Sequence, residues 1–541
     1  MILKEDSTEQ KLRGAYYTPQ KAARKMAEFF KDLPIRTILE PSCGNGVFVE
    51  AALDHGLLDD DGTMTAIEIE ASAVQQTGER IGQQENIRLL HMDFFQYYEQ
   101  HKEDPGYDLI LGNPPYIRYQ YLKEQQREEM SRILTEHGMK ANKLINTWVG
   151  FLVACVHLLN ETGKIAFVIP AEILQVAYAQ ELRSFLAREL SQITLLTFEE
   201  LVFPDIEQEI LILIGEKGEQ EKGIRIMELN NLDDLDTLDL DTNGFQKLSH
   251  VQEKWTKYFM NAKENKLVTC LRKDKRFRKM SDLALINIGI TTGNNKYFSV
   301  TQKAVEEYEL EEVVRPLIGR SSHAGSVYFQ KEDWMKNVRN GKAAYLIDFP
   351  DVPVEQYPDS HKRYIAKGEE NHDHEGYKCS IRERWYRVPS IWVPDAFFLR
   401  RNNLYPKFVL NCCNAVSTDT MHRIKFYEGV DPQKAVLSYY NSISFAFTEL
   451  CGRSYGGGVL EILPGELGNV ILPVFDDLST EQVQKILLQV DRMVRKKDAI
   501  EEVLDLVDQE LLVDGLGIDR EVCTTARKIW KKMQRRRLKR G

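Results

Sequence analysis

From residue 35 to residue 216, short apolar runs alternate with segments of helical periodicity. Amphipathic stretches separate four runs that have the length and residue types of buried strands, namely "TILE", "TMTAIEIE", "NIRLLHMDFF" and "YDLILG". A long helical stretch, "NTWVGFLVACVHLLN", then leads to the strand-like "GKIAFVIP", "ITLLTFEE" and "EILILIGE". This alternation predicts an α/β domain with a doubly wound parallel sheet. The ligand crevice of such a sheet lies at the carboxyl ends of its strands.

The pattern changes after residue 216, where "EKGEQEKG" and the acidic "NNLDDLDTLDLDTNG" predict a surface connection. Further on, "INIGITTGNNKYF" and "GRSYGGGVLEILPGELGNVILP" combine short strand-like runs with glycine-rich turns, and "STEQVQKILLQVDRMV" has a Ser/Gln capping box before a helical pattern. A chain of 541 residues is too long for one core. We therefore expect a first domain over 1–225, a linker over 226–265, a mixed α+β domain over 266–475 and a helical region with a basic tail over 476–541.

The composition is that of an ordinary globular protein, with 43% apolar and 28% charged residues. No apolar run reaches the ~18 residues of a membrane span, and the opening "MILKEDSTEQK" is charged where a signal peptide is apolar. We therefore expect a cytoplasmic protein with no membrane partner. The eight cysteines are scattered without a CxxC pair, so neither a disulfide framework nor a metal site is expected.

The net charge of −11 argues at first against a nucleic-acid partner. A phosphate backbone responds to local patches, however, and basic residues cluster in "RKDKRFRK", "RERWYR" and "RKIWKKMQRRRLKR". Each cluster is either a binding element or a solvated face. Charge alone therefore leaves a nucleic-acid partner open.

The loop after the first predicted strand, "LEPSCGNGVF", suggests a small-molecule site. Gly44 and Gly46 stand between a strand and a helix, where the missing side chains let a ligand approach the backbone and the helix N-terminus. Glu40 comes just before this loop. An acid there is unsuited to phosphates but suits a positively charged group such as an amine or a sulfonium.

Acids also end the next two predicted strands. Glu68 and Glu70 point the same way from an extended strand, so either carboxylate could take both hydroxyls of a ribose. Asp93 and Phe94 end the third strand, and an acceptor beside a ring suits adenine. Acids at three successive strand ends predict a pocket for S-adenosylmethionine.

The fourth strand stops abruptly at "NPPY", residues 113 to 116. Proline cannot donate to a sheet and restricts the residue before it, so this loop must be stiff and extended. If the Asn113 side-chain oxygen and the Pro114 carbonyl accept hydrogen bonds from an amino group, its nitrogen is held toward a methyl donor without a strong base. Tyr116 offers a flat surface for a base removed from its stack. The arrangement predicts an amino or amide nitrogen as the nucleophile better than it predicts the substrate.

"GAYYTP", "LEPSCGNGVF", "AIEIE", "DFF" and "LILGNPPY" occur in the order found in the gamma-class DNA N6-adenine methyltransferases of restriction-modification systems. The chain resembles that family over roughly residues 10 to 215. The resemblance implies a class I, Rossmann-like S-adenosylmethionine-dependent methyltransferase domain. The glycine-rich segments of the second half resemble, less specifically, those of target-recognition domains, which implies that role for 266–475.

The family motifs can be transferred residue by residue. Thr18 and Pro19 resemble the segment that closes over the methionine end of the cofactor. Glu68 matches the ribose acid better than Glu70 does, and Phe203 in "ELVFPDIEQEILILIG" resembles the aromatic that stacks on the target base. The resemblance thus implies cofactor binding by Thr18, Pro19, Glu40, Pro41, Ser42, Cys43, Gly44, Gly46, Glu68, Asp93, Phe94 and Pro115, catalysis by Asn113, Pro114, Pro115 and Tyr116, and base stacking by Tyr116 and Phe203.

The function that follows is methyl transfer from S-adenosylmethionine to N6 of a flipped-out adenine in duplex DNA. The protein would act beside a separately encoded restriction endonuclease or as an orphan methylase. One alternative is an NPPY methyltransferase for RNA or for a protein glutamine. Another is a DNA-specificity subunit that has lost activity. A fused nuclease is not expected, because no PD followed by ExK occurs at a plausible spacing.

Overall fold

The computed structural model describes residues 18–140, 145–176, 178–200, 209–240, 244–248, 254–496 and 499–539. The chain divides into two compact units, and the division falls between Asn261 and Ala262. This boundary lies inside the segment 226–265, which the sequence marks as a connection. Part of that segment belongs to the first unit, because it contributes to the strand Gly223–Leu229 and the strand Gln246–Lys247 of its sheet.

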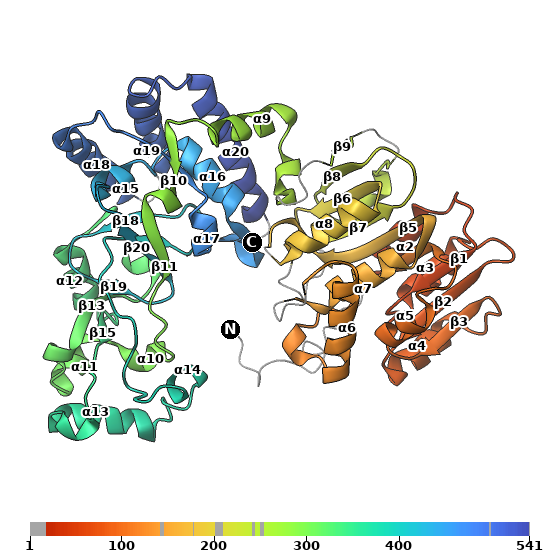
Figure 1. Ribbon diagram of the computed structural model, residues 1–541, viewed down its shortest axis with the longest axis horizontal. Coiled ribbons are helices and arrows are strands. Elements are labelled where there is room, and N and C mark those ends of the chain that lie inside the picture. Colours follow the sequence, from red (N-terminus) through yellow and green to blue (C-terminus); the bar gives the residue numbers. More distant parts are fainter. Residues whose placement is uncertain are drawn as a thin grey trace. The chain divides into compact units, whose positions relative to one another are not determined.

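The first unit is built on a nine-stranded sheet with the order β3-β2-β1-β4-β5-β7-β6-β8-β9 (Figure 1). Strands β3, β2, β1, β4 and β5 are parallel, as the sequence predicts, whereas β7 is antiparallel to both β5 and β6. The described strands are β1 (Thr37–Glu40), β2 (Thr63–Glu68), β3 (Ile87–His91), β4 (Tyr107–Gly112), β5 (Leu159–Pro170), β6 (Gln192–Phe198), β7 (Ile210–Glu216), β8 (Gly223–Leu229) and β9 (Gln246–Lys247).

Helices cover this sheet in two groups whose members pack against one another. The first group is α2 (Gln20–Glu28), α3 (Val47–Asp54) and α4 (Ala71–Ile81), and the second is α5 (Phe94–His101), α6 (Glu124–Glu136), α7 (Thr147–His157) and α8 (Ala179–Glu189). The chain moves outward from β1 to β3 and then returns past β1 to β4. Because parallel crossovers are right-handed, this reversal changes the face that the helices cover. The predicted doubly wound fold is confirmed, and its switch point lies between β1 and β4.

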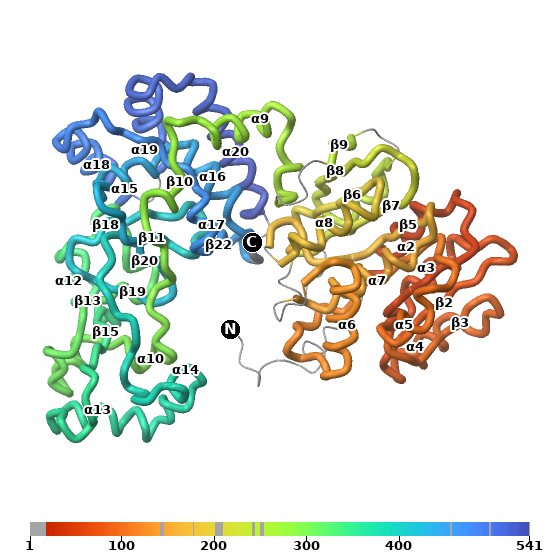
Figure 2. Tube along the Cα trace, viewed as in Figure 1, coloured from red at the N-terminus to blue at the C-terminus, as the bar shows by residue number. Residues whose placement is uncertain are grey.

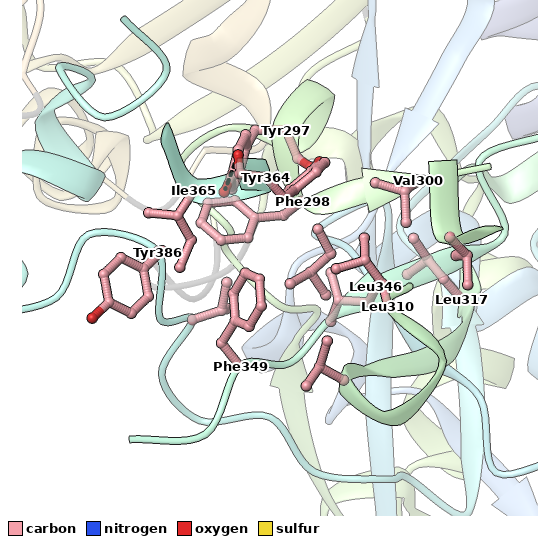
Figure 3. Packing of buried hydrophobic residues seen from close by; sticks show 14 of the residues in the cluster. Tyr297, Phe298, Val300, Leu310, Leu317, Leu346, Phe349, Tyr364, Ile365 and Tyr386 are labelled. Carbon is pink, nitrogen blue, oxygen red and sulfur yellow. Dashed lines mark hydrogen bonds between the residues drawn. The ribbon is translucent and has the colours of Figure 1, made fainter. Parts of the chain in front are cut away.

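The second unit is a mixed α+β structure, as predicted, with several small sheets. Its described strands pair in the orders β11-β20-β16-β18-β14, β12-β15-β13-β19, β17-β22-β21 and β10-β23. A hydrophobic cluster around Tyr297, Phe298 and Leu346 forms one of its cores (Figure 3). The strands are β10 (Phe277–Lys279), β11 (Ala284–Ile288), β12 (Ser299–Val300), β13 (Val314–Ile318), β14 (Tyr328–Phe329), β15 (Tyr345–Ile347), β16 (Ala396–Leu399), β17 (Arg401–Asn402), β18 (Phe408–Asn411), β19 (Val416–Ser417), β20 (Met421–Phe426), β21 (Arg453–Tyr455), β22 (Val459–Glu461) and β23 (Ile471–Pro473).

The first and last segments of the second unit lie side by side (Figure 2). Strand β10 pairs with β23, and helix α9 contacts helix α20, which closes the unit on itself. Its described helices are α9 (Ala262–Leu271), α10 (Asn295–Phe298), α11 (Gln302–Glu307), α12 (Lys331–Arg339), α13 (Asp359–Glu370), α14 (Tyr377–Ser380), α15 (Pro432–Leu437), α16 (Ser442–Cys451), α17 (Pro464–Leu467), α18 (Thr480–Val494), α19 (Ile500–Val507) and α20 (Arg520–Leu538).

The capping box predicted before the C-terminal helices is confirmed. The Ser479 hydroxyl accepts from the Gln482 backbone N–H at 3.2 Å, and the Gln482 side-chain oxygen accepts from the Ser479 N–H at 2.9 Å. These bonds satisfy two of the N–H groups that a helix start leaves without partners. Helix α18 therefore begins where the sequence predicts, and it buries Val483, Leu487, Val490 and Val494.

The basic tail is partly structural, because Arg537 of α20 is buried. Its guanidinium donates to the Glu449 carboxylate of α16 at 2.8 Å, and the two side chains are 2% and 3% exposed. It also donates to the carbonyls of Asn403 and Gly458. Burial raises the pKa of Glu449 and the guanidinium lowers it, so each charge stabilises the other. One arginine therefore ties α20 to α16 and to two loops.

Replacing Arg537 by alanine should lower the free energy of unfolding of the second unit by about 3–5 kcal/mol, because Glu449 would be left as an uncompensated buried charge. Urea unfolding of the full chain, followed by tryptophan fluorescence, measures the loss. Arg535→Ala is the matched control, since Arg535 is exposed on the same helix. It should shift stability by no more than about 0.5 kcal/mol. Equal free energies of unfolding for the two variants would contradict a structural role for Arg537.

Candidate active site

Four parallel strands bring the predicted cofactor and substrate residues to one edge of the sheet. Glu40 ends β1 and Glu68 ends β2, while Asp93 and Asn113 follow β3 and β4 closely. The strand order β3-β2-β1-β4 therefore places these side chains in one row across the switch point. Ligands of doubly wound sheets bind in the crevice at this position.

The glycine-rich loop after β1 is pinned from two sides. The Cys43 N–H donates to the Ile67 carbonyl of β2 at 2.8 Å, and the Thr77 hydroxyl of α4 donates to the Gly44 carbonyl at 2.9 Å. Gly46 has a φ of 79°, and a Cβ there would lie 2.8 Å from the Thr77 methyl carbon. Any side chain at Gly46 would be strained and would push the loop away from α4. The loop is therefore fixed before a ligand arrives.

The structure distinguishes the two acids at the end of β2. One Glu68 carboxylate oxygen accepts from the Gly44 N–H at 2.9 Å, and the other accepts from the Glu70 N–H at 2.8 Å. Glu68 is buried against the loop, whereas Glu70 is exposed at the start of α4. Carboxylate oxygens have further lone pairs, so Glu68 can still accept from a ligand hydroxyl. This geometry favours Glu68 over Glu70 as the ribose acid.

Glu40 and Thr18 each carry a buried polar atom without a hydrogen-bond partner. Glu40 is 1% exposed, and its Oε2 atom lacks a partner, as does the hydroxyl of the buried Thr18. Burial and the neighbouring Glu68 raise the pKa of Glu40 well above its ordinary value. Buried polar atoms without partners are rare in folded proteins. A ligand with a positive charge and N–H donors, such as the methionine end of S-adenosylmethionine, would supply the partner that Glu40 lacks.

Asp93 and Phe94 are held at the start of α5. Asp93 caps the helix by accepting from the Phe95 N–H at 2.8 Å, and its other oxygen accepts from the Gln126 side-chain amide at 2.7 Å. The Phe94 ring stacks on Phe151 of α7, with ring centroids 4.7 Å apart. Sequence reasoning missed Phe151, because it is one apolar residue among many in a buried helix. Its contact with Phe94 makes it part of the candidate adenine site.

The NPPY loop begins directly against the cofactor loop. A Cβ on Gly112 would lie 3.4 Å from the Pro41 ring, and the Ser42 hydroxyl donates to the Asn113 carbonyl at 3.3 Å. The stiff segment predicted at this strand end thus contacts the loop after β1. The structure brings Pro41, Ser42 and Asn113 together although they are about 70 residues apart in the chain.

Two further contacts immobilise the rest of the NPPY loop. The Tyr116 hydroxyl donates to the Val168 carbonyl of β5 at 3.0 Å, and burial raises the pKa of Tyr116 well above its ordinary value. The backbone N–H and the hydroxyl of Thr147, at the start of α7, both donate to the Ile117 carbonyl, at 2.9 and 2.7 Å. The plane of the Tyr116 ring is therefore fixed and the phenol stays neutral.

Some predictions lie beyond these observations. Phe203 lies outside the described residues, so its predicted stacking role stays a prediction. Thr18 and Pro19 come just before α2, which packs on α3.

Among the described residues, no group of three or more His, Cys, Asp or Glu side chains could hold a metal ion. In the same ranges no helix has the length and apolar character needed to cross a membrane.

Two family models match the chain. Residues 49–203 match the model described as "Eco57I restriction-modification methylase". Residues 252–512 match the model described as "Type II methyltransferase M.Eco57I, C-terminal domain". Together the two matches cover more than half of the chain and reach both units.

Relatives and solved structures agree with these matches. The Type II methyltransferase M.AccI of Acinetobacter calcoaceticus is 24% identical in a 528-residue alignment that covers 92% of this chain and 92% of that protein. M.HindII of Haemophilus influenzae is 24% identical over 314 residues, or 55% of this chain and 57% of that protein. The Type IIL restriction-modification enzyme MmeI, solved in complex with DNA, shares the fold with a TM-score of 0.56 and 13% identity, over 95% of this chain and 72% of that one. The chain belongs to the Eco57I family of Type II restriction-modification methyltransferases.

Proposed function

We propose that the protein transfers a methyl group from S-adenosylmethionine to N6 of an adenine in a specific duplex DNA sequence. The observation that carries the proposal is the contact between the two loops at the switch point. The Ser42 hydroxyl reaches the Asn113 carbonyl, so the NPPY loop lies against the loop that begins at the buried Glu40. An amino group bound at Asn113 would thus lie close to a sulfonium bound near Glu40.

Each part of the cofactor has a group suited to it in the first unit. Glu40 and Thr18 would take the charged methionine end, Glu68 the ribose hydroxyls, and Asp93 with Phe94 and Phe151 the adenine. S-adenosylmethionine supplies an electrophilic methyl group on a sulfonium. The pinned loop of residues 41–46 would position that end of the cofactor without rearrangement, which lowers the entropic cost of binding.

The protein would act on the nucleophile by positioning. The lone pair of adenine N6 is delocalised into the ring, so the amino group is a weak nucleophile. The Asn113 side-chain oxygen and the Pro114 carbonyl would accept its two hydrogens and turn the lone pair toward the methyl group. Tyr116 would stack on the flipped base, and its hydrogen bond to Val168 sets the plane of that contact. Phe203 would cover the opposite face.

The second unit would recognise the DNA site. The first unit contains all the cofactor and NPPY residues, so the remaining part from about residue 266 is available for target recognition, with the helices after residue 475 packed on it. Relatives that align with almost the whole chain are Type II methyltransferases, which favours duplex DNA over RNA or a protein glutamine as the acceptor. The buried acids and the fixed NPPY loop favour an active enzyme over a specificity subunit that has lost activity. A cognate restriction endonuclease would be a separate protein.

Methyl transfer to DNA is tested with labelled S-adenosylmethionine and unmethylated genomic DNA, with RNA and protein extract as parallel acceptors. The wild-type protein should produce N6-methyladenine in DNA. Asn113→Ala should lower the rate by at least about 100-fold, because a misplaced acceptor leaves the amino group unoriented. Its cofactor affinity should stay unchanged. Label in RNA or protein alone, or full activity of Asn113→Ala, would refute the proposal.

Glu68→Gln should weaken binding of S-adenosylmethionine by about 10- to 100-fold, because hydrogen bonds to a charged group are worth about 1.5–3 kcal/mol. The amide oxygen can still accept from the Gly44 N–H, which keeps the loop in place, while the hydrogen bond from the Glu70 N–H is lost. Calorimetric titration gives the affinity, and kinetics should show a higher KM for the cofactor with little change in kcat. Glu70→Gln is the matched control at the same strand end. Equal losses in the two variants would remove the distinction between the acids.

Glu40→Gln should stabilise the unliganded protein and weaken its cofactor binding. The pKa of Glu40 is raised in the folded state, so the native protein holds this proton more tightly than the unfolded chain. Stability of the wild type therefore falls as pH rises from the ordinary glutamate pKa toward the folded value, and the variant lacks this fall. Thermal unfolding between pH 5 and pH 8 checks the sign, with Glu70→Gln as control. A variant less stable than the wild type throughout this range would contradict the assignment.

A further inference from the structure

The second unit exposes two large apolar side chains next to each other at α14. Tyr377 is 72% exposed and Ile381 is 61% exposed, and no other large hydrophobic residue in the described ranges is more exposed. They are four residues apart across one helical turn, so their side chains lie on the same side. Contiguous exposed apolar side chains mark interaction surfaces more often than scattered single ones do.

A neighbouring loop is fixed to this turn. Arg382 donates to the Thr291 carbonyl at 3.2 Å, and the Asn294 side chain donates to the Asp373 carboxylate at 2.7 Å. Gly293 has a φ of 88°, and a Cβ there would lie 2.9 Å from the Cys379 sulfur. Residues 291–296 and 376–382 thus form one surface, which we call the α14 knob.

The α14 knob is anchored in an aromatic core, because its Cys379 is buried in the same cluster as Tyr297 and Tyr364. Figure 3 shows the aromatic side chains of this core. The Tyr297 ring packs on Phe298 and on Tyr364 with centroids 4.9 and 4.8 Å apart, and the Tyr364 hydroxyl donates to the Tyr297 carbonyl at 2.6 Å. A Cβ on Gly368 would lie 2.4 Å from atoms of Tyr297 and Trp385. Packing this close leaves no free volume in the aromatic core, so the core resists deformation when a partner contacts the knob.

The charges on the α14 knob suit a polyanion. Lys296 and Lys378 are exposed, and together with Arg382 they have no carboxylate within ion-pair distance in the described part of the chain. The Lys378 ammonium lies 5.7 Å from the centre of the Tyr377 ring, so cation and aromatic ring are presented together. The two segments of the knob contain no acid of their own, and of the acids that flank them Glu375 pairs with His372 and Glu383 with Arg384.

We propose that the α14 knob is a wedge for duplex DNA. Lys296 and Lys378 contact phosphates, while Tyr377 and Ile381 press between base pairs and unstack one step. Apolar wedges of this kind deform duplexes, and they need a rigid support and flanking cations. The inference rests on the proposed function, because it takes the DNA substrate from it. It assigns a specific contact surface to the second unit that the catalytic residues do not require.

The wedge is tested on the full-length protein with a duplex that carries the methylated site, identified by modification-sensitive sequencing. 2-Aminopurine is placed at successive positions, and its fluorescence reports unstacking. Tyr377→Ala should remove the fluorescence rise at one step and weaken binding by about 10-fold, the order expected for loss of one stacked aromatic contact. Ile381→Ala, which removes an aliphatic part of the wedge, should reduce the fluorescence rise at the same step. A duplex with a mismatch or an abasic site at that step should bind the alanine variants with most of the wild-type affinity, because its base pair is already disrupted.

Matched controls separate the wedge from general damage. Tyr427 is also an exposed tyrosine of the second unit, and Tyr427→Ala should behave as the wild type. Lys378→Ala should lower the slope of binding against salt concentration by about one, as for a lost phosphate contact. Lys485→Ala, an exposed lysine on α18, should leave that slope unchanged.

Two results would overturn the wedge. Tyr377→Ala could match the wild type in affinity and in fluorescence, or it could dissociate an oligomer of the protein without changing DNA binding. The second result would assign the surface to protein contacts. In both cases the wild type still methylates DNA. Failure of the proposed function itself is distinct, because the wild-type protein would then transfer no methyl group to DNA.

Discussion

The adjacency of β1 and β4 is the constraint on which the candidate site depends. The chain leaves these strands toward opposite faces of the sheet, so no crossover covers their carboxyl ends. The pairing of Ile38 with Leu109 and of Leu39 with Ile110 then sets how far the two following loops reach. Pro41 comes to rest against Gly112, and Ser42 bonds to the Asn113 carbonyl. A shift in this register would separate the acid of one loop from the amide of the other.

This geometry is maintained at a cost to stability. A carboxyl group as buried as that of Glu40, with an oxygen that lacks a partner, disfavours its charged form in the unliganded protein. The surrounding hydrogen bonds offset this cost, because Glu68, Thr77 and Thr147 each fix a loop backbone at the site. Functional sites commonly break a rule that the rest of the fold keeps. Glu40 breaks the rule that buried polar atoms have hydrogen-bond partners, and a bound cation would supply the missing partner.

The sequence places the candidate residues on the sheet better than it predicts the contacts that hold them, and the roles of these residues stay predictions. Strand ends and stiff turns follow from local patterns, so these patterns alone place Glu40, Asp93 and Asn113 on the correct edge of the sheet. The resemblance prefers Glu68 to Glu70 as the ribose acid, and the Gly44 contact adds a physical reason that the strand pattern alone does not contain. Phe151 and the inserted antiparallel strand β7 depend on packing between segments far apart in the chain, which no local pattern encodes. The domain roles and the stacking of Phe203 stay predictions.

The sequence also cannot show which basic residues are unpaired, because ion pairs form between residues that are far apart in the chain. "RERWYR" is a basic cluster in the sequence, yet its arginines differ in the fold: Arg384 and Arg387 share the Asp351 carboxylate, whereas Arg382 belongs to the α14 knob. Arg537 of the basic tail forms a buried ion pair with Glu449. Lys296 and Lys378 belong to no conspicuous basic run, but the fold brings both to the α14 knob, where neither forms an ion pair within the described ranges and Lys378 lies over the Tyr377 ring. Which cations remain available to a polyanion thus depends on the ion pairs that form when the chain folds.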